Sequence, residues 1–321
     1  MKKRYWVAGS ALAAGVAGVW ALRQKPRHAQ TFSLELPGGT GIADSGEGSV
    51  QFIGTATTLI RYAGLTILTD PNFLHRGERV HIGYGMHATR LTDPAIDFDS
   101  LPPVDFVLLS HLHEDHFDKL VQRRLSKNTP ILTTPSAARA LRRMGFSSLF
   151  PLRTWDHVAV RKGGASLRVT AVPGTHGPMP VSAMLPDVMG SLLDFRNGRD
   201  GGHYRMYISG DTLIFRDLEE IPIRYPHIDL ALLHLGGTRV LGVLVTMDAQ
   251  QGVEALRIMR PDLAIPVHYD DYDIFQSPLE DFRHAVERAG LQEKVRYLSR
   301  GETYAFTLKG ARQTVGERPL V

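Results

Sequence analysis

Short apolar segments recur from about residue 50 onward, and turn-forming residues separate them. Runs of this length that are rich in Val, Ile, Leu and Thr predict β-strands. The predicted strands are Val50–Ile53, Thr58–Tyr62, Leu65–Thr69, Val104–Ser110, Pro130–Thr133, Leu167–Val172, Tyr204–Ser209, Ile228–His234, Leu263–Val267 and Val295–Leu298.

Segments with helix-start and helix-stop signals interleave with the later strands. Thr134 followed by Pro predicts a helix over "SAARALRRM", and Asp248 caps "AQQGVEALRIM". Ser277 and Glu280 have the spacing of a capping box, and Gly290 ends that helix. Strands in the first half followed by strand–helix alternation predict an α/β fold with mixed sheets.

Two long segments, 71–103 and 173–202, show no clear periodicity and are too long for plain connections in a compact domain. The first contains "FLHRGERVHIGYGMHATR", residues 73–90, which is rich in His and Arg. One interpretation is a lid that binds an anionic group through arginine. A solvated rim is the commoner role for such a loop.

The N-terminal segment "MKKRYWVAGSALAAGVAGVWALRQKPR" has uncharged residues from Tyr5 to Leu22 between basic flanks. Eighteen such residues are at the lower limit for a bilayer-spanning helix, and no good cleavage site follows them. We therefore expect an anchor, with a signal peptide as the alternative, in a membrane-anchored or exported protein. The expected organisation is an anchor or signal segment at 1–28, a linker at 29–48 and a catalytic domain at 49–321.

The net charge of +4 belongs to this leader, which holds six basic residues, because the first acidic residue of the chain is Glu35. Residues 28–321 contain 31 basic and 33 acidic residues, a net charge of −2. We therefore expect no nucleic-acid partner. The chain has no cysteine, so any metal ligands must be His, Asp or Glu.

A dense group of such ligands follows the apolar run in "VLLSHLHEDHFD", residues 107–118. On a turn at a strand end, His111 and His113 can converge on one ion, with Asp115 and His116 close to a second position. Imidazole nitrogen and carboxylate oxygen both bind zinc. Three further ligands stand at or just past other predicted strand ends: His176, Asp211 and His268. Side chains at strand ends leave the core together, and seven ligands can hold two ions about 3.5–4 Å apart.

This set, His111-x-His113-x-Asp115-His116 with His176, Asp211 and His268, resembles the motifs of the metallo-β-lactamase superfamily. The resemblance extends from about residue 49 to 306, and Asp70 matches the early Asp of the superfamily. It implies a four-layer αβ/βα sandwich of two mixed β-sheets flanked by helices. It also implies that one ion is held by His111, His113 and His176. The other ion is then held by Asp115, His116 and His268, and Asp211 bridges the two.

The resemblance implies a hydrolase that uses a hydroxide bridging two zinc ions, oriented by Asp115 or Asp211. Iron or manganese accept the same ligands. "TDPNF", "GDT" and "VHYDDY" are similar to the branch with ascorbate-phosphate lactonase and the phospholipase D that hydrolyses N-acyl-phosphatidylethanolamine. Glu114 and His234 depart from that branch, which often has an aromatic residue and a proline there. His234 is a candidate proton donor or substrate contact, or equally a hydrogen-bonded structural histidine. Asp118 could accept from a ligand imidazole or cap a helix.

The expected reaction is hydrolysis of a phosphodiester, and the leader suggests a lipid-derived one. The alternative substrates are a lactone or an amide, attacked by the same dinuclear site. A different class of function is a metal-binding or scaffold protein without turnover. A small-molecule or lipid-derived substrate and a membrane contact through the leader are the expected partners, and the sequence leaves the oligomeric state open.

Overall fold

The computed structural model describes residues 28–38, 46–83, 86–197 and 201–310. The predicted anchor at 1–28 lies almost wholly outside these ranges. The described residues from Thr31 onward belong to one compact unit. Within the described ranges no helix is both long and apolar enough to cross a bilayer.

The first of two seven-stranded sheets has the order β1-β10-β11-β12-β13-β14-β17. Its two antiparallel hairpins, β10–β11 and β12–β13, are joined edge to edge, whereas β13, β14 and β17 are parallel. The strands are β1 (Thr31–Leu36), β10 (His157–Lys162), β11 (Ala165–Val172), β12 (Gly190–Asn197), β13 (His203–Ile208), β14 (Leu230–His234) and β17 (Leu263–Val267).

The second sheet has the order β18-β2-β3-β4-β7-β8-β9, antiparallel as far as β4 and parallel from β4 to β9. Its strands are β18 (Thr303–Thr307), β2 (Glu47–Gly54), β3 (Thr57–Tyr62), β4 (Leu65–Thr69), β7 (Phe106–Leu108), β8 (Ile131–Thr133) and β9 (Leu149–Pro151). Two short hairpins lie outside the sheets: β5 (Arg79–Gly83) with β6 (Met86–Thr89), and β15 (Arg239–Val240) with β16 (Val243–Leu244).

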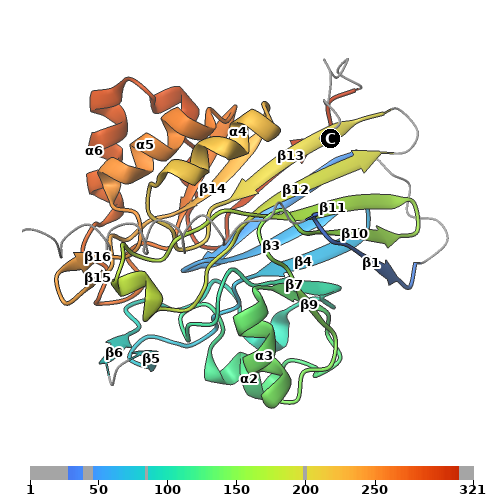
Figure 1. Cartoon of the computed structure of the whole chain (residues 1–321), viewed down its shortest axis with the longest axis horizontal. Helices are drawn as coiled ribbons and strands as arrows, with labels where there is room; N and C mark the ends of the chain where they lie inside the picture. The colour runs from blue at the N-terminus through green and yellow to red at the C-terminus, as the bar shows by residue number, and fades with distance from the viewer. Residues whose placement is uncertain (1–27, 39–45, 84–85, 198–200, 311–321) are drawn as a thin grey trace, which may run out of the picture. The chain divides into compact units, whose positions relative to one another are not determined.

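Helices cover the outer face of each sheet (Figure 1). Against the first sheet lie α4 (Glu220–Arg224), α5 (Ala249–Met259) and α6 (Leu279–Ala289), and against the second lie α2 (Lys119–Arg124) and α3 (Pro135–Arg143). Short 3-10 helices are η1 (Phe98–Ser100), η2 (Val181–Ala183), η3 (Arg216–Glu219) and η4 (Gln292–Lys294). The two mixed sheets with helices outside them confirm the expected sandwich.

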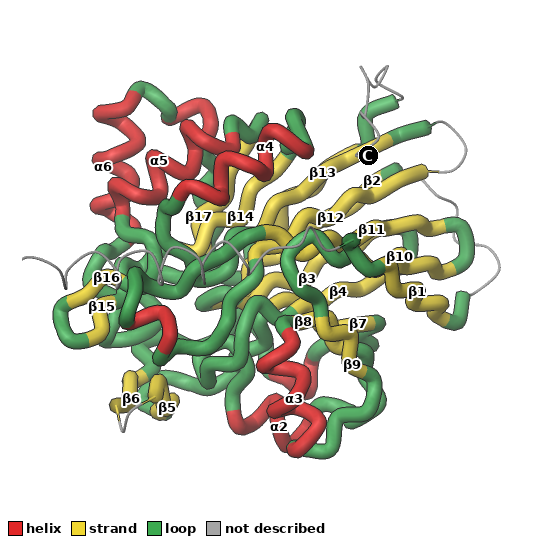
Figure 2. Tube along the Cα trace, viewed as in Figure 1, coloured by secondary structure: helices red, strands yellow, loops and turns green. Residues whose placement is uncertain are grey.

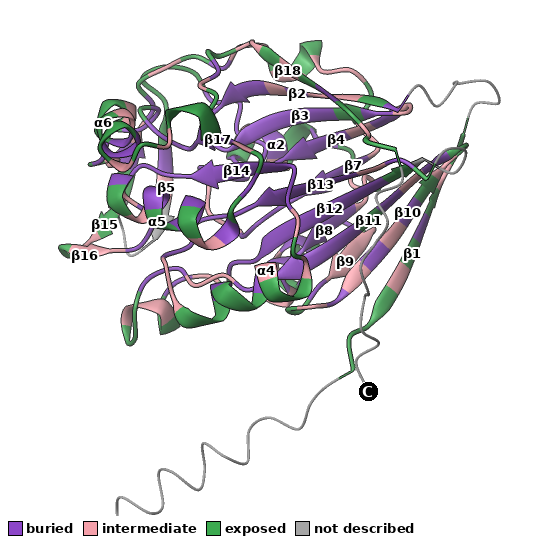
Figure 3. Ribbon diagram, turned by 90° about the horizontal axis from the view of Figure 1, so that it is seen from above, coloured by how far each residue is buried: buried purple, intermediate pink, exposed green. Residues whose placement is uncertain are grey.

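The alternation of side chains along each strand produces these layers. In β14, Leu230 and Leu232 belong to the core between the two sheets, whereas Ala231 and Leu233 pack under α4 and α5. Strands covered on both faces are buried throughout, as the central strands in Figure 3 show. Such strands read as continuous apolar runs, which is why they could be recognised in the sequence.

The strand predictions are confirmed where the run is apolar throughout, although β7 is shorter than the predicted Val104–Ser110. The predicted strand Val295–Leu298 is wrong, since Val295 makes only an isolated bridge to Ala264. The expected linker at 29–48 contains β1 and the start of β2. β1 was not recognised because it is an edge strand whose residues are mostly exposed and polar.

The predicted helix caps are confirmed at two of three positions. Thr134 accepts a hydrogen bond from the Ala137 N–H, and Asp248 accepts one from the Gln251 N–H. The capping box at Ser277 is wrong: α6 begins at Leu279 without a side-chain cap, and the Ser277 hydroxyl instead accepts from the Ala249 N–H of α5. Gly290 ends α6 in the left-handed conformation, as predicted.

Candidate metal centre

The seven predicted ligands follow the carboxyl ends of four strands. The segment from His111 to His116 follows β7, His176 follows β11, Asp211 follows β13 and His268 follows β17. Loops gather at this end of the two sheets, where both short hairpins also lie (Figure 2). The fold therefore brings together residues that are up to 157 positions apart, counted from His111 to His268.

The first group is formed by the three imidazoles of His111, His113 and His176. The distance from His113 Nδ1 is 3.0 Å to His111 Nε2 and 3.3 Å to His176 Nε2. Two nitrogens bound at about 2.0–2.1 Å to one tetrahedral zinc ion stand roughly 3.3 Å apart, so this spacing suits a shared ion.

Hydrogen bonds on the far side of two rings orient this first group. His176 Nδ1 donates to the Val245 carbonyl at 2.9 Å, and His111 Nδ1 is 3.0 Å from the Ser110 hydroxyl. Such partners fix the ring and direct the Nε2 atom toward the cluster.

The second group consists of Asp115, His116, Asp211 and His268, all buried, with potential ligand atoms within 4.8 Å of one another. His116 Nε2 lies 3.2 Å from His268 Nε2 and 3.4 Å from Asp211 Oδ2. Asp115 Oδ2 lies 3.4 Å from His268 Nε2. His268 is oriented by its Nδ1, which donates to the Leu235 carbonyl.

Some ligand atoms of the second group have no hydrogen-bond partner in the protein and are placed as metal ligands would be. Asp115 Oδ1 and Asp211 Oδ1 are buried and lack a hydrogen-bond partner. Buried carboxylate oxygens are costly to leave unpaired, so they call for a cation. The rings of His111 and His116 are centred 4.2 Å apart, so the two groups adjoin, as a dinuclear centre requires.

The two groups differ in the charge they favour. Burial and neighbouring imidazoles lower the pKa of His113 to about 3 and hold that of His111 well below its usual value. Burial also lowers the pKa of His176. Burial opposes protonation of His116 too, but Asp211 and Asp115 outweigh it and hold its pKa well above the usual value. The first group thus offers neutral imidazoles, and the second attracts positive charge.

The backbone at two of the ligand loops is constrained. His268 has a φ of 60°, which is uncommon for a residue with a side chain, and its N–H donates to the Thr55 carbonyl at 2.6 Å. Gly210, next to Asp211, has a φ of 62°, and a Cβ there would lie 2.8 Å from the Met189 carbonyl oxygen. Conformations of this kind persist where the surrounding structure imposes them, and they concentrate at functional sites.

Asp70 and His234 form a layer behind the second group. Asp70 Oδ1 accepts from the Ser110 N–H, and Asp70 Oδ2 lies 3.3 Å from His234 Nε2 and 3.4 Å from His116 Nδ1. His234 is fully buried, and its Nδ1 lies 3.3 Å from the Ser209 hydroxyl. The structure thus favours the structural alternative for His234 over contact with a substrate.

A cavity of about 400 Å³ opens beside the first group. Its apolar lining comes from the loop after β7, the end of α3 and the segment after η2, and its polar lining includes His81 of β5. The lining residues are His81, Leu112, His113, Glu114, Phe117, Gln122, Met144, Met184, Leu185 and Pro186. This volume lies in the range of small-molecule sites.

The loop 73–90 divides between rim and interior. His81 borders the cavity, and its N–H donates to Glu114 Oε2 at 2.7 Å, which joins β5 to the loop of residues 111–116, here called the metal loop. Arg90 is fully buried and donates to Asn72, so it is not available to an anionic substrate, whereas Arg76 and Arg79 are exposed.

Two supporting residues were not recognised from the sequence. The Asn72 side chain donates to the Glu114 carbonyl and to the Tyr272 hydroxyl, so it connects the metal loop to the segment after β17. Both residues lie in stretches noted for their resemblance, "TDPNF" and "VHYDDY". Asp118 caps α2 through the Val121 N–H and also accepts from the Phe73 N–H, which supports its role as a helix cap.

Comparison with protein families and curated proteins finds clear relatives. The model of a β-lactamase superfamily domain matches residues 66–269. A UPF0173 metal-dependent hydrolase of Archaeoglobus fulgidus is 30% identical over 234 residues, which cover 67% of this chain and 91% of the relative. A second, from Hyperthermus butylicus, is 26% identical and covers 81% of this chain and 100% of the relative.

Solved structures share the fold at lower identity. An isothiocyanate hydrolase from Delia radicum gut bacteria has a TM-score of 0.68 and 22% identity, covering 81% of this chain and 99% of that one. A metallo hydrolase from Ignicoccus hospitalis has a TM-score of 0.59 and 23% identity, covering 82% of this chain and 100% of that one.

Proposed function

We propose that this chain, which belongs to the β-lactamase superfamily and is a metal-dependent hydrolase of the metallo-β-lactamase fold, holds two divalent ions and hydrolyses a small, partly apolar carbonyl substrate such as a lactone or an amide. The observation that carries the proposal is the pair of adjoining His/Asp groups beside a cavity with apolar and polar lining. The more specific assignment to the branch with ascorbate-phosphate lactonase stays a prediction.

The ligand assignment follows the two groups. His111, His113 and His176 would hold one ion, Asp115, His116 and His268 the other, and Asp211 would lie between them. Two such ions would lower the pKa of a shared water and polarise the electrophilic atom of the substrate. Zinc suits this donor set, and iron or manganese accept the same ligands.

The protein residues orient the reactants. The Thr246 hydroxyl donates to Asp211 Oδ2 at 3.1 Å, which leaves Oδ1 directed into the group. Asp115 Oδ1 is likewise unpaired and could accept a proton of the attacking water. His113, half-buried in the wall of the cavity, lies where the substrate meets the metal centre.

The lining of the cavity supports a neutral substrate. Among the described residues that line it there is no Lys or Arg, and Glu114 is the charged one. A phosphodiester or another anion would meet this carboxylate in a wall without Lys or Arg, since Lys119, 3.4 Å from Glu114, does not line the cavity. Leu112, Phe117 and Leu185 would instead cover an apolar substituent.

A phosphodiester, the expectation from the sequence, is the second candidate. Exposed Arg142 and Arg143 precede Met144 on α3, and Met144 lines the cavity. These cations would raise the local concentration of an anionic substrate near the opening. We also propose that the leader attaches the protein to a membrane, with export as the alternative.

A panel of chromogenic or directly absorbing substrates tests the proposal. Zinc-loaded protein would be assayed with a neutral aryl lactone, an aryl amide, an aryl isothiocyanate, a bis-aryl phosphodiester and a β-lactam. Asp211→Ala should abolish turnover, and Asp217→Ala, which removes an exposed acid on η3, should leave it unchanged. Phosphodiester turnover alone would overturn the carbonyl proposal, and equal activity in Asp211→Ala would overturn the proposed centre.

A further inference from the structure

The segment from residue 119 to 155 has an unusual charge. It contains eight basic residues, Lys119, Arg123, Arg124, Lys127, Arg139, Arg142, Arg143 and Arg153, and no acidic residue. The rest of residues 28–321 then has 23 basic and 33 acidic residues, a net charge of −10. The body is therefore strongly polarised, although its total charge is only −2.

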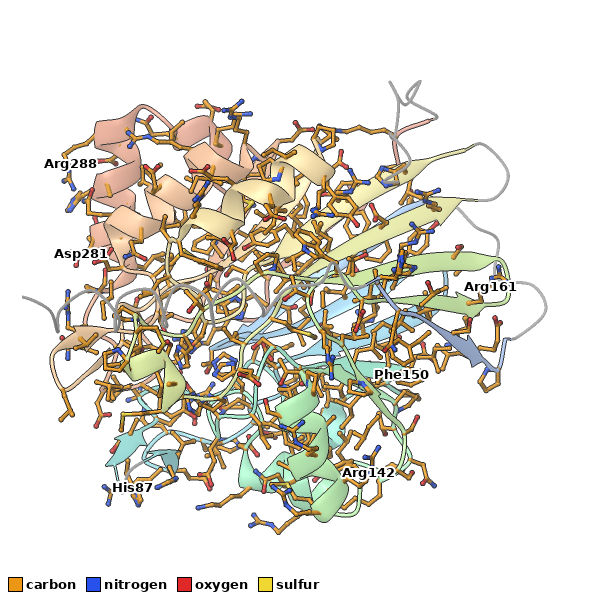
Figure 4. The ribbon with its side chains drawn as sticks, in the orientation of Figure 1. His87, Arg142, Phe150, Arg161, Asp281 and Arg288 are labelled. Atoms are coloured by element: carbon orange, nitrogen blue, oxygen red, sulfur yellow. The ribbon has the colours of Figure 1, made fainter. Side chains whose placement is uncertain are left out.

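The fold places most of this charge on one exposed surface. α2 and α3 both pack on the outer face of the second sheet (Figure 1). Figure 4 labels Arg142 on this pair of helices. The exposed basic residues of the pair are Lys119, Arg123, Arg124, Arg139, Arg142 and Arg143, which we call the α2–α3 basic surface.

α3 shows how sharply the charge is separated. Ala137, Ala138 and Leu141 are buried against the sheet, while Arg139, Arg142 and Arg143 recur at the i, i+3 and i+4 positions of the opposite face. On the outer face of this helix, all the long side chains are therefore arginines.

Few of these cations are neutralised. Lys119 is 3.4 Å from Glu114, and Arg124 is 2.8 Å from Asp99. Within the described part of the chain, Arg123, Arg139, Arg142 and Arg143 have no ion pair. Cations in the last turn of a helix stabilise its dipole, which accounts for Arg123, Arg142 and Arg143. It does not account for Arg139 or for the missing acidic residues.

Apolar side chains adjoin this surface at the opening of the cavity. Met144, directly after Arg143, is 39% exposed, and Met184 is 57% exposed. Both line the cavity beside the metal centre. Cations next to exposed apolar side chains are characteristic of surfaces that rest in the headgroup region of a bilayer.

A nucleic-acid partner fits these residues less well. Binding to single strands relies on exposed aromatic side chains on which bases stack. The aromatic residues of the segment are Phe146, Phe150 and Trp155, and none of them is exposed. Phe146 lies instead beneath the Lys127 ammonium, 3.9 Å from its ring centre, and Phe150 packs on Phe32.

We propose that the α2–α3 basic surface docks on an anionic lipid bilayer, with Met144 and Met184 at the headgroup level, so that the opening of the cavity faces the membrane. The attraction comes from the unpaired arginines and is independent of the leader and of metal. Docking would deliver apolar substrates from the bilayer to the metal centre, whichever bond is hydrolysed there.

Vesicle co-sedimentation tests the proposal with a chain from residue 28 onward, since the cores of the fold all lie in the unit that begins at Thr31. The vesicles are phosphatidylcholine alone or with about 30% phosphatidylserine, at 0.1 M salt with a chelator present. We expect binding to the anionic vesicles alone, and its loss at 1 M salt, where surface charges are screened.

The variant is Arg139→Gln/Arg142→Gln/Arg143→Gln, and its matched control is Arg216→Gln/Arg257→Gln/Arg288→Gln. The control removes three exposed arginines that stand in the last turns of η3, α5 and α6. The first variant should lower the partition coefficient on the order of 100-fold, about fivefold per arginine, and the control should change it little.

Each contrary outcome is decisive. Equal binding to neutral vesicles, equal loss in the two triple variants, or no binding to anionic vesicles would overturn the proposal. Binding of a single-stranded oligonucleotide that depends on the same arginines, without vesicle binding, would assign the surface to nucleic acid instead. The single substitution Arg142→Glu, at an exposed position, checks the result should the triple variant not fold. Failure here would leave the hydrolase proposal untouched, because no activity is measured.

Discussion

Individual residues of the candidate metal centre are held by hydrogen-bond partners on the side away from the two groups. Imidazole ligands are oriented through backbone carbonyls, as with His176 and Val245, or through Asp70, which lies between His116 and His234. Partners of this kind fix the orientation of a ligand and strengthen its bond to the metal. The chemistry of a ligand therefore depends on residues that touch neither metal nor substrate.

His234 provides a test of this positioning role. Replacing it by Asn removes a donor to Asp70 and should lower metal affinity about 10–100-fold, as loss of such partners generally does. Competition with a chelator would measure the affinity, and kcat at saturating metal should change little. A fall of kcat of about 10²–10⁴-fold at saturating metal would instead indicate a proton donor.

Gly210 is the residue whose backbone most directly limits substitution beside Asp211. Gly210→Ala adds a Cβ 2.8 Å from the Met189 carbonyl at a φ of 62° and should destabilise the fold by about 2–3 kcal/mol. Gly242→Ala is the control, since Gly242 also has a positive φ, 80°, but open space around it. Urea unfolding should separate the two, and equal costs would contradict the clash.

At the scale of elements, paired strands are held together by buried ion pairs as well as by apolar contacts. Asp194 of β12 faces Arg205 of β13 directly in the register, and its Oδ1 accepts from Arg205 Nε at 2.6 Å and lies 2.9 Å from His203 Nε2. Burial opposes ionisation of Asp194, but His203 and Arg205 outweigh it and lower its pKa.

This pair predicts a pH dependence of stability. A carboxyl whose pKa is lower in the folded state stabilises the fold above its unfolded pKa, and the effect is lost as pH falls through the folded pKa. Asp194→Ala should cost up to about 3 kcal/mol at pH 7, and the difference from the parent chain should shrink below about pH 4.

Urea unfolding between pH 7 and pH 3 would measure the effect of Asp194→Ala. Glu35→Ala, which removes an exposed acid 3.9 Å from Arg161, should cost less than about 0.5 kcal/mol throughout. A difference for Asp194→Ala that grows on acidification would contradict the assigned sign.

At the scale of the whole molecule, the candidate metal centre takes its residues from both sheets. His111, His113 and His116 follow β7 of the second sheet, whereas Asp211 and His268 follow strands of the first. An ion held by residues from both sheets would bind the folded state only, so it would stabilise the whole fold by an amount that rises with the logarithm of its concentration over Kd.

Metal removal is therefore expected to lower thermal stability. Chelator-treated protein should melt several degrees below protein with metal at about 100 times Kd, where binding contributes about 2.7 kcal/mol. Asp211→Ala should show a much smaller shift on adding metal. A melting temperature that changes neither with chelator nor with added zinc would contradict the proposed centre.

The sequence by itself determined the elements and residues whose signals are local. Buried strands such as β14 are continuous apolar runs, and the caps at Thr134 and Asp248 lie within three residues of the groups they satisfy. The candidate metal ligands could be proposed for a similar reason, because they stand at or just past the ends of apolar runs. Edge strand β1 and the role of Ser277 could not be recognised, because they depend on residues far away in the sequence: β1 pairs with β10, and Ser277 accepts from the Ala249 N–H.

Only the tertiary structure decided which distant groups meet. His111, His113 and His176 lie within reach of one ion, and His234 contacts Asp70. Met144 and Met184 line the same cavity. The tertiary structure also placed the exposed arginines of α2 and α3 on the outer side of the second sheet. Contacts between residues far apart depend on sheet order and register, which no local pattern of side chains specifies.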